Sequence, residues 1–147
     1  MPSYAAVAKA HESLLQRSET WLFGSALPLW LSQGIHAPSG GIVEGLSFQG
    51  QPLPLPRRLM IQGRQLYVFR TAHEWGYKGA DLPAAMRRVA QQLLSLYSQP
   101  DGSFAHSVAL DGKASEARPD LYGQAFTLFG LASAYKVLGD PAYRARA

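Results

Sequence analysis

Residues 82–97 show the clearest pattern of hydrophobic and polar positions in the chain. Leucine, methionine, valine and tyrosine recur every three or four residues, and arginine, glutamine and serine occupy positions between them. This spacing predicts a helix with one buried face. Asp81 is a suitable N-cap and Pro83 suits the first turn, so the helix is expected to begin at residue 82.

Two further segments, residues 57–75 and 120–138, also predict long helices. The second is apolar almost all round, which is typical of a helix that is buried on most sides. Its apolar residues include Leu121, Tyr122, Phe126, Leu128, Phe129, Leu131, Tyr135, Val137 and Leu138. One half-exposed and one largely buried helix per unit is the arrangement that an α/α toroid or solenoid requires.

The sequence contains an internal repeat with an offset of 62 residues. Residues 38–72 align with residues 100–134 without a gap, and the shared residues are mainly turn formers plus one polar position in each helix. The matched pairs are Pro38 and Pro100, Gly40 and Gly102, Gly50 and Gly112, Leu59 and Leu121, Gln62 and Gln124, Leu66 and Leu128, and Ala72 and Ala134. Chance does not easily place a Pro-x-Gly, a second glycine and a glutamine at the same offsets.

Each repeat begins with a Pro/Gly turn and a short alternating segment, residues 41–48 and 103–110. We expect these segments to form small hairpins or extended loops before the long helices. A glutamine near the start of each helix, Gln62 or Gln124, could hold the loop against the helix by hydrogen bonds.

The repeats therefore predict an all-α fold, part of an α/α toroid with about two and a half helical hairpins and short β-like loop segments. Stacked repeats generally need about three units or more, with caps. Gly139 marks the end of one helix, and Asp140 and Pro141 mark the start of another, with only six residues after Pro141. We expect residues 1–147 to be an incomplete N-terminal portion of a single domain.

Composition limits the functional classes. The chain has 147 residues, of which 47% are apolar, and this is enough apolar side chains to form the core of one domain. It contains no cysteine, which excludes disulfides and thiolate sites and favours a cytoplasmic location. The net charge is +4, but the 14 lysines and arginines are scattered, so we expect no nucleic-acid partner. The apolar stretch at residues 21–31 is too short to span a membrane.

Three motifs resemble the N-acylglucosamine 2-epimerase family, and most of all its mannose-6-phosphate isomerase-like branch. They are "PRRLMIQGRQLYVFRTA" at residues 56–72, "DLYGQAFTLFGLASAYKVLGD" at residues 120–140 and "GGIVEGLSFQGQP" at residues 40–52. The segment "LPLWLSQG" at residues 27–34 resembles the end of the family's first helix. Ile42 departs from the aromatic residue that is usual in the family.

The resemblance implies an (α/α)6 barrel and a sugar epimerase or aldose–ketose isomerase that works through an ene-diol intermediate. It also implies that histidines from later hairpins act as acid and base, so we expect the 147-residue chain alone to be inactive. The substrate would be a sugar or sugar phosphate, without a metal or other cofactor. A homodimer is a further expectation.

The resemblance assigns roles to particular residues. Arg64 matches an arginine that contacts a sugar oxygen and stabilises negative charge, and Tyr122 matches a tyrosine that lines the sugar site. Gln62 and Gln124 are candidate substrate-side groups, and Glu44 in the first loop is another. Without the resemblance, Arg64 would be read as an arginine whose stem covers apolar surface, and Tyr122 as a core aromatic.

Two other classes remain open. The first is a non-catalytic helical-repeat module that binds carbohydrate or protein. The second is an α/α-toroid glycoside hydrolase, which needs two carboxylates at a set separation; Glu116 and Asp120 are the candidates. The four histidines show no metal-ligand spacing and are interpreted as loop or surface residues; they are His11, His36, His73 and His106.

Overall fold

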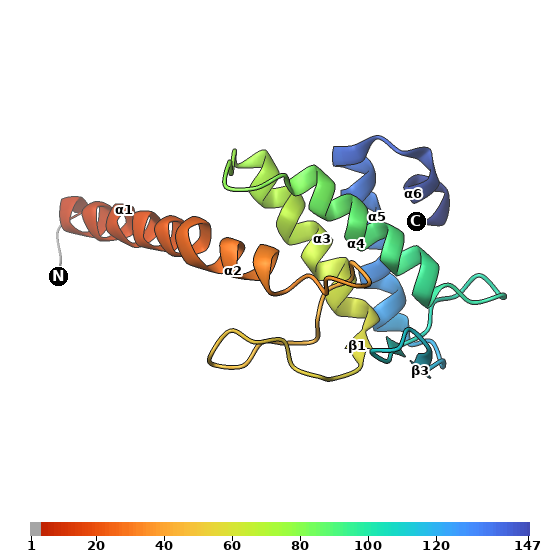
Figure 1. Ribbon diagram of the computed structural model, residues 1–147. Helices are drawn as coiled ribbons and strands as arrows, with labels where there is room; N and C mark the ends of the chain where they lie inside the picture. The colour runs from red at the N-terminus through yellow and green to blue at the C-terminus, as the bar shows by residue number, and fades with distance from the viewer. Residues whose placement is uncertain (1–3) are drawn as a thin grey trace.

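Figure 1 shows the computed structural model, which describes residues 4–147. The fold is helical, as the sequence predicts, and a short π-helix, Leu22–Ala26, joins the first two α-helices. The α-helices are α1 (Tyr4–Trp21), α2 (Leu27–Ser32), α3 (Leu59–Glu74), α4 (Leu82–Tyr97), α5 (Leu121–Leu138) and α6 (Pro141–Arg146). Within residues 4–147, no helix has both the length and the apolar character needed to cross a membrane.

Three short strands form an antiparallel sheet of order β1–β2–β3. They are β1 (Arg57–Arg58), β2 (Ser107–Val108) and β3 (Ala114–Glu116). Arg57 pairs with Val108 and Arg58 with Ser107, and the backbone N–H of Leu59 donates to the His106 carbonyl at 2.8 Å. The helix predicted from residue 57 therefore begins two residues later, because Arg57 and Arg58 are held extended against the second loop.

The 62-residue repeat is present in the backbone of the two loops. The N–H of Gly50 donates to the carbonyl of Ser47 at 2.9 Å, and that of Gly112 donates to Ala109 at 3.1 Å. The turns match one another at the predicted offset, and both of these glycines have positive φ, 77° and 88°. A glycine is favoured there because side-chain-bearing residues rarely adopt this conformation.

The glutamines anchor both loops to their helices in the same way. Gln62 accepts from the N–H of Ile42 at 2.7 Å and donates to its carbonyl at 2.9 Å. Gln124 accepts from the N–H of Phe104 at 3.0 Å and donates to its carbonyl at 2.8 Å. The hydrogen bonds expected from the structural interpretation of these two residues are thus present in both repeats.

Helices α3 and α5 pack most extensively on one another and cross at two glycines. A methyl group on Gly63 would lie 2.1 Å from the carbonyl oxygen of Phe126, and one on Gly130 would lie 2.5 Å from the Gly63 Cα. Both distances are far below van der Waals contact. The close approach of the two backbones therefore requires the missing side chains.

The prediction that α5 is buried on most sides is wrong for this chain. Leu121 is 87% exposed, and Leu128 and Phe129 are each 44% exposed. Only α3, α4 and α6 pack extensively on α5 among the described residues, so one long face of the helix has no neighbour. The buried side instead carries small residues: Gly123, Thr127, Gly130, Ser133 and Ala134, with Leu131.

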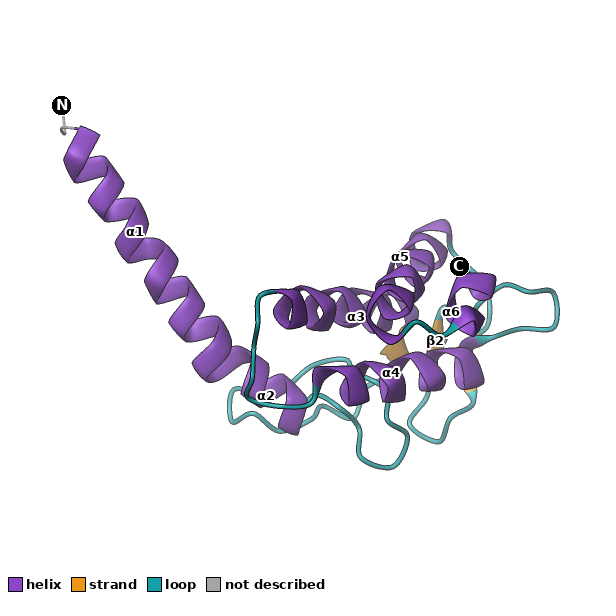
Figure 2. Cartoon of the chain, turned by 90° about the horizontal axis from the view of Figure 1, so that it is seen from above, coloured by secondary structure: helices purple, strands orange, loops and turns teal. Residues whose placement is uncertain are grey.

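Helix α4 behaves as its pattern predicts. Asp81 accepts a hydrogen bond from the Ala84 N–H at 2.9 Å, and the apolar face is buried against α3. Leu82, Met86, Val89 and Leu93 are almost fully buried. The core of the molecule lies between α4 and the α3–α5 pair, seen from above in Figure 2.

The last helix, α6, begins at Pro141, where the sequence predicts the start of a helix. Gly139 has φ of 69° and ends α5, and Asp140 accepts from the Ala142 N–H at 2.9 Å. So short a helix is not stable alone. Tyr143 packs it onto the core and is only 2% exposed, which explains why α6 is present.

Helix α1, whose limits the pattern analysis did not predict, projects away from the rest of the molecule as an arm (Figures 1 and 2). Its apolar side chains are largely exposed: Leu14 at 58%, Leu15 at 70% and Trp21 at 64%. Beyond the π-helix, Leu27 of α2 is buried and joins the core.

Candidate functional site

Arg64 and Tyr122, predicted from separate motifs, meet between α3 and α5. The Nη2 of Arg64 donates a hydrogen bond to the Tyr122 hydroxyl. The guanidinium also lies over two rings, 4.6 Å from the centroid of Phe126 and 5.5 Å from that of Tyr122. These contacts hold the arginine by cation–π attraction and fix the direction of its charge.

An aromatic cluster continues along the same face of the α3–α5 pair. Tyr122 and Phe126 make an edge-on contact with centroids 4.8 Å apart, and Tyr67 and Phe129 lie 4.7 Å apart across the two helices. Tyr122 is 52% exposed and Tyr67 is 37% exposed. Arg64 thus lies in an accessible aromatic surface, which is the kind of lining that binds small organic ligands.

The sequence analysis missed Tyr67, Phe126 and Phe129 as members of this cluster. The repeat alignment contained a signal for them, because Arg64 aligns with Phe126 and Tyr67 with Phe129 at the same offset of 62. Equivalent positions in the two repeats lie on the same face of the α3–α5 pair. The assignment of Arg64 to a site therefore predicts that Phe126 belongs to the same site.

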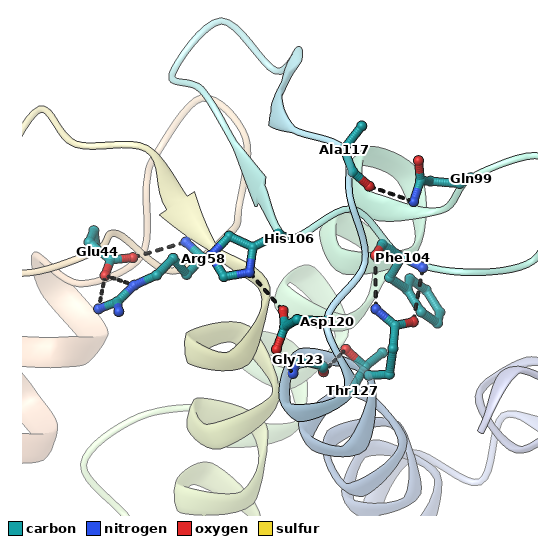
Figure 3. Close-up of polar contacts among 10 residues, drawn as sticks. Glu44, Arg58, Gln99, Phe104, His106, Ala117, Asp120, Gly123 and Thr127 are labelled. Carbon is teal, nitrogen blue, oxygen red and sulfur yellow. Dashed lines mark hydrogen bonds and ion pairs between the residues drawn. The ribbon is translucent and has the colours of Figure 1, made fainter.

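Glu44 is engaged by a neighbouring arginine. Its carboxylate accepts from the backbone N–H of Arg58 at 2.9 Å and from the Arg58 Nε at 2.5 Å (Figure 3). Only 10% of the Glu44 side chain is exposed. The carboxylate therefore fixes the start of α3, and the sugar contact expected for it stays a prediction.

His106 and Asp120 form the equivalent pair in the second repeat, since they follow Glu44 and Arg58 by 62 residues. The His106 Nδ1 lies 2.7 Å from the Asp120 Oδ2, as Figure 3 shows. The other carboxylate oxygen accepts from the Gly123 N–H at 2.8 Å and caps α5. The hydrogen bond with His106 and then that from Gly123 lower the pKa of Asp120.

Neither glutamine amide is free in this structure. Gln62 is fully buried, and both ends of its amide are used by Ile42. Gln124 is partly buried and is used in the same way by Phe104. Their proposed contacts with a sugar stay predictions.

The remaining histidines lie where they were expected. His11 on α1 and His73 near the end of α3 are exposed, and His36 is in the first loop. Within residues 4–147, no three histidine, aspartate or glutamate side chains come together as a metal-binding group. The carboxylate of Asp120 is committed to His106 and to the start of α5, while Glu116 lies on the exposed strand β3.

The comparison with protein-family models settles the family. The model described as N-acylglucosamine 2-epimerase (GlcNAc 2-epimerase) matches residues 40–147. The chain belongs to the N-acylglucosamine 2-epimerase family. The match covers both repeats, the Arg64–Tyr122 contact and the two anchored loops.

Two known proteins resemble this epimerase-family chain. It is 37% identical over 120 residues to a protein named mannose-6-phosphate isomerase from Rhizobium meliloti (strain 1021), covering 82% of this chain and 31% of that protein. It also resembles the structure of cellobiose 2-epimerase from Spirochaeta thermophila DSM 6192, with a TM-score of 0.81 and 23% identity. That match covers 99% of this chain and 35% of the other.

The structural likeness shows the fold of the epimerase-family chain, which is part of an (α/α)6 barrel as predicted. The chain spans about a third of the length of the relatives that it matches. Helix α4 lies between α3 and α5 in the sequence, and α3 and α5 occupy equivalent positions in the two repeats. Their shared face, with Arg64 and the aromatic cluster, is the candidate site.

Proposed function

We propose that the protein carrying this chain is a sugar epimerase or aldose–ketose isomerase that forms an ene-diol intermediate. The family membership and the contact between Arg64 and Tyr122 support this proposal. The sugar opens to its carbonyl form, a base removes the proton on the neighbouring carbon, and the electron pair moves onto the carbonyl oxygen. A proton then adds to the former carbonyl carbon while the neighbouring hydroxyl loses its proton and becomes the carbonyl, which gives the isomer, or it returns to the original carbon from the opposite face and the first carbonyl forms again, which gives the epimer.

Arg64 is suited to the oxygen that becomes negative in this reaction. Its charge is fixed, and its side chain is only partly exposed and oriented by Tyr122 and Phe126. An oriented donor that needs no rearrangement during the reaction stabilises the developing oxyanion better than water does. The exposed aromatic rings beside it can cover the apolar faces of a sugar ring.

The substrate class follows from the same observations. A neutral sugar would be held by hydrogen bonds to Arg64 and Tyr122 and by contact with the rings of the aromatic cluster. We propose Gln62, Gln124 and Glu44 as supports that keep α3 and α5 and their loops in place. The expected cytoplasmic location and the expected homodimer stay predictions.

The activity can be tested by following exchange of the proton on C2 with solvent. Mannose, mannose 6-phosphate and cellobiose are incubated with the protein in D₂O, and loss of the C2 proton signal is measured by NMR. An ene-diol mechanism predicts exchange with at least one of the sugars. If the protein exchanges none of them and forms no isomer, the proposed function is wrong.

The role of Arg64 has its own test. We expect Arg64→Ala to lower kcat/KM by about 10²–10³-fold, as loss of one oxyanion donor typically does. Arg144→Ala, on the exposed side of α6, removes the same charge and serves as the matched control. An unchanged rate in Arg64→Ala would remove this residue from the mechanism while leaving the proposed activity intact.

A further inference from the structure

Arg57 is a buried cation with only neutral hydrogen-bond partners. Its residue is 1% exposed. The Nη1 donates to the Ser39 hydroxyl at 2.5 Å, and the Nη2 donates to the Ala109 carbonyl at 3.2 Å. The Nε is buried and has no partner among the described residues.

This arrangement leaves a charge uncompensated inside the protein. Within residues 4–147, no carboxylate forms an ion pair with Arg57, and the nearby loop carboxylate of Glu44 is used by Arg58. A buried ion without a counter-charge costs several kcal/mol, and proteins normally pair such groups. The uncompensated charge of Arg57 therefore favours the binding of an anion nearby.

A polar pocket lies between the first loop and α4, and Ser39, which accepts the hydrogen bond from Arg57, is one of its lining residues. The loop contributes Pro38, Ser39 and Gly40, and α4 contributes Arg88, Gln92 and Ser95. Its volume is about 270 Å³, which leaves room for a tetrahedral oxyanion. The residues that line it include no acidic side chain.

Three contacts place the two arginines around this pocket. Ser39 lines it and accepts the hydrogen bond from Arg57. Gly41 lies close both to Arg57 and to the lining residue Gln92, because a methyl group on it would lie 3.4 Å from the Arg57 Nη1 and 3.0 Å from the Gln92 Cγ. On the other wall, a methyl group on Gly40 would lie 3.7 Å from the Arg88 Nε.

We propose that this pocket binds the phosphate group of a small molecule. Arg88 contacts the phosphate directly, and Ser39 lies between it and the buried charge of Arg57. Arginine suits this task because its planar donors match phosphate oxygens. The site lies against helix α4, whereas Arg64 faces the aromatic cluster between α3 and α5, so the two are separate.

His36 provides a reporter within the same cluster. Its Nδ1 lies 2.8 Å from the Ser39 hydroxyl. Burial and then the charge of Arg57 lower the pKa of His36. The charged group that acts on it is Arg57 from β1, and a bound phosphate offsets this charge. Binding should therefore raise the pKa of His36, which NMR of the imidazole protons can follow.

The experiment is a titration of the protein with inorganic phosphate at constant ionic strength, followed by NMR chemical shifts of the 36–41 loop and by calorimetry. We expect saturable binding that is weakened on the order of tenfold in Arg88→Gln, a loss of about 1.4 kcal/mol. Arg87→Gln is the matched control, because Arg87 is an exposed neighbour outside the pocket with the same charge. It should bind phosphate like the original protein.

A second set of ligands identifies the source of the phosphate. Equal affinities for phosphate and mannose 6-phosphate, with no binding of mannose in the pocket, would show that the phosphate group alone is recognised. Tighter binding of mannose 6-phosphate would show that the pocket also contacts the sugar. In both cases Arg64→Ala should leave the binding to this loop unchanged.

Two results would overturn the proposal. One is the absence of saturable shifts in the 36–41 loop with either phosphate compound. The other is equal weakening in Arg87→Gln and Arg88→Gln, which would indicate general attraction to a basic surface. Thermal unfolding of each variant without phosphate shows that it is folded, so a loss of binding is not a loss of structure.

Discussion

The two repeats share their glycine turns and loop anchors but have different surroundings. Leu59 and Leu121 are equivalent at the offset of 62, but Leu59 is fully buried and Leu121 is 87% exposed. Leu66 and Leu128 differ in the same way, at 0% and 44%. The difference shows that a helix acquires its burial from the helices beside it, and not from its own sequence alone.

Some equivalent positions carry the same residue in both repeats, and others carry different residues. The residue that anchors the loop is glutamine in both, whereas Arg64 is replaced by Phe126 and Met60 by Tyr122 at the equivalent positions. In each repeat the anchoring glutamine bonds to the N–H and carbonyl of one loop residue, so it contacts the same backbone groups. On the shared face of α3 and α5 the positions are complementary, because α3 supplies the cation Arg64 and α5 supplies the two rings that hold it.

The largest expected effect comes from making the repeats more alike. Gly63 aligns with Ala125, so Gly63→Ala gives both repeats the same residue. The added methyl group would lie 2.1 Å from the Phe126 carbonyl oxygen, and we expect a loss of about 3 kcal/mol or more in the free energy of unfolding. Urea denaturation measures it.

Gly24→Ala is the control for this substitution, because a methyl group at Gly24 would meet nothing within 4 Å. That variant should be as stable as the original chain or slightly more stable, owing to the helix propensity of alanine. Equal stability of Gly63→Ala and Gly24→Ala would contradict the close crossing of α3 and α5.

The next effect compares the equivalent leucines. We expect Leu66→Ala to lower the free energy of unfolding by about 3 kcal/mol, because it leaves a cavity in the core. Leu128→Ala should cost less than about 1 kcal/mol, because its side chain is 44% exposed. Similar losses in urea denaturation would mean that a further part of the protein covers Leu128.

The two glutamine variants should differ less in their free energy of unfolding than the two leucine variants do. Gln62→Leu removes two hydrogen bonds from a fully buried loop segment, and we expect a loss of about 2 kcal/mol. Gln124→Leu removes the same two bonds at a partly exposed position, where water can replace them, and should cost about 1 kcal/mol. Hydrogen exchange at the Ile42 and Phe104 amides gives a direct local measurement, and faster exchange is expected at each in its own variant.

The smallest expected effect concerns the charge of Asp120. Its pKa in the folded protein is below the ordinary value of 3.8, so its ionised form stabilises the fold above that pH. This contribution is lost as the pH falls through the lower folded pKa. Asp120→Asn keeps a cap and removes the charge, so we expect it to cost about 0.5–1 kcal/mol at pH 7.

The difference between Asp120→Asn and the original chain should shrink in urea denaturation as the pH is lowered below 3.8. Glu19→Gln, on the exposed arm α1, provides the control and should show no such change. A difference that stays constant down to low pH would argue against stabilisation by the ionised carboxylate.

The sequence predicted the features that depend on local chemistry. Asp81, Asp140 and Gly139 marked helix limits correctly, because caps and left-handed glycines are determined within a few residues. The internal repeat predicted the loop anchors at Gln62 and Gln124. The motif resemblance singled out Arg64 and Tyr122, which are in contact, and the sugar contacts that it implies for them stay predictions.

Features that depend on distant partners could not be predicted. The exposure of Leu121 and Leu128 results from which helices lie beside α5, and the burial of Arg57 results from two loops that close over it. The pair of His106 and Asp120 was missed because one residue was read as a loop histidine and the other as a candidate acid. Only the offset of 62 relates it to the pair of Glu44 and Arg58.

The loop anchors have a consequence for how this architecture can vary. A glutamine side chain ends in the same group as a peptide unit, and here it pairs with a residue as a neighbouring strand would. The glutamine bonds only to main-chain atoms, so the anchored residue can be isoleucine in one repeat and phenylalanine in the other. Loop side chains are therefore free to diversify between copies while the path of the loop stays constant.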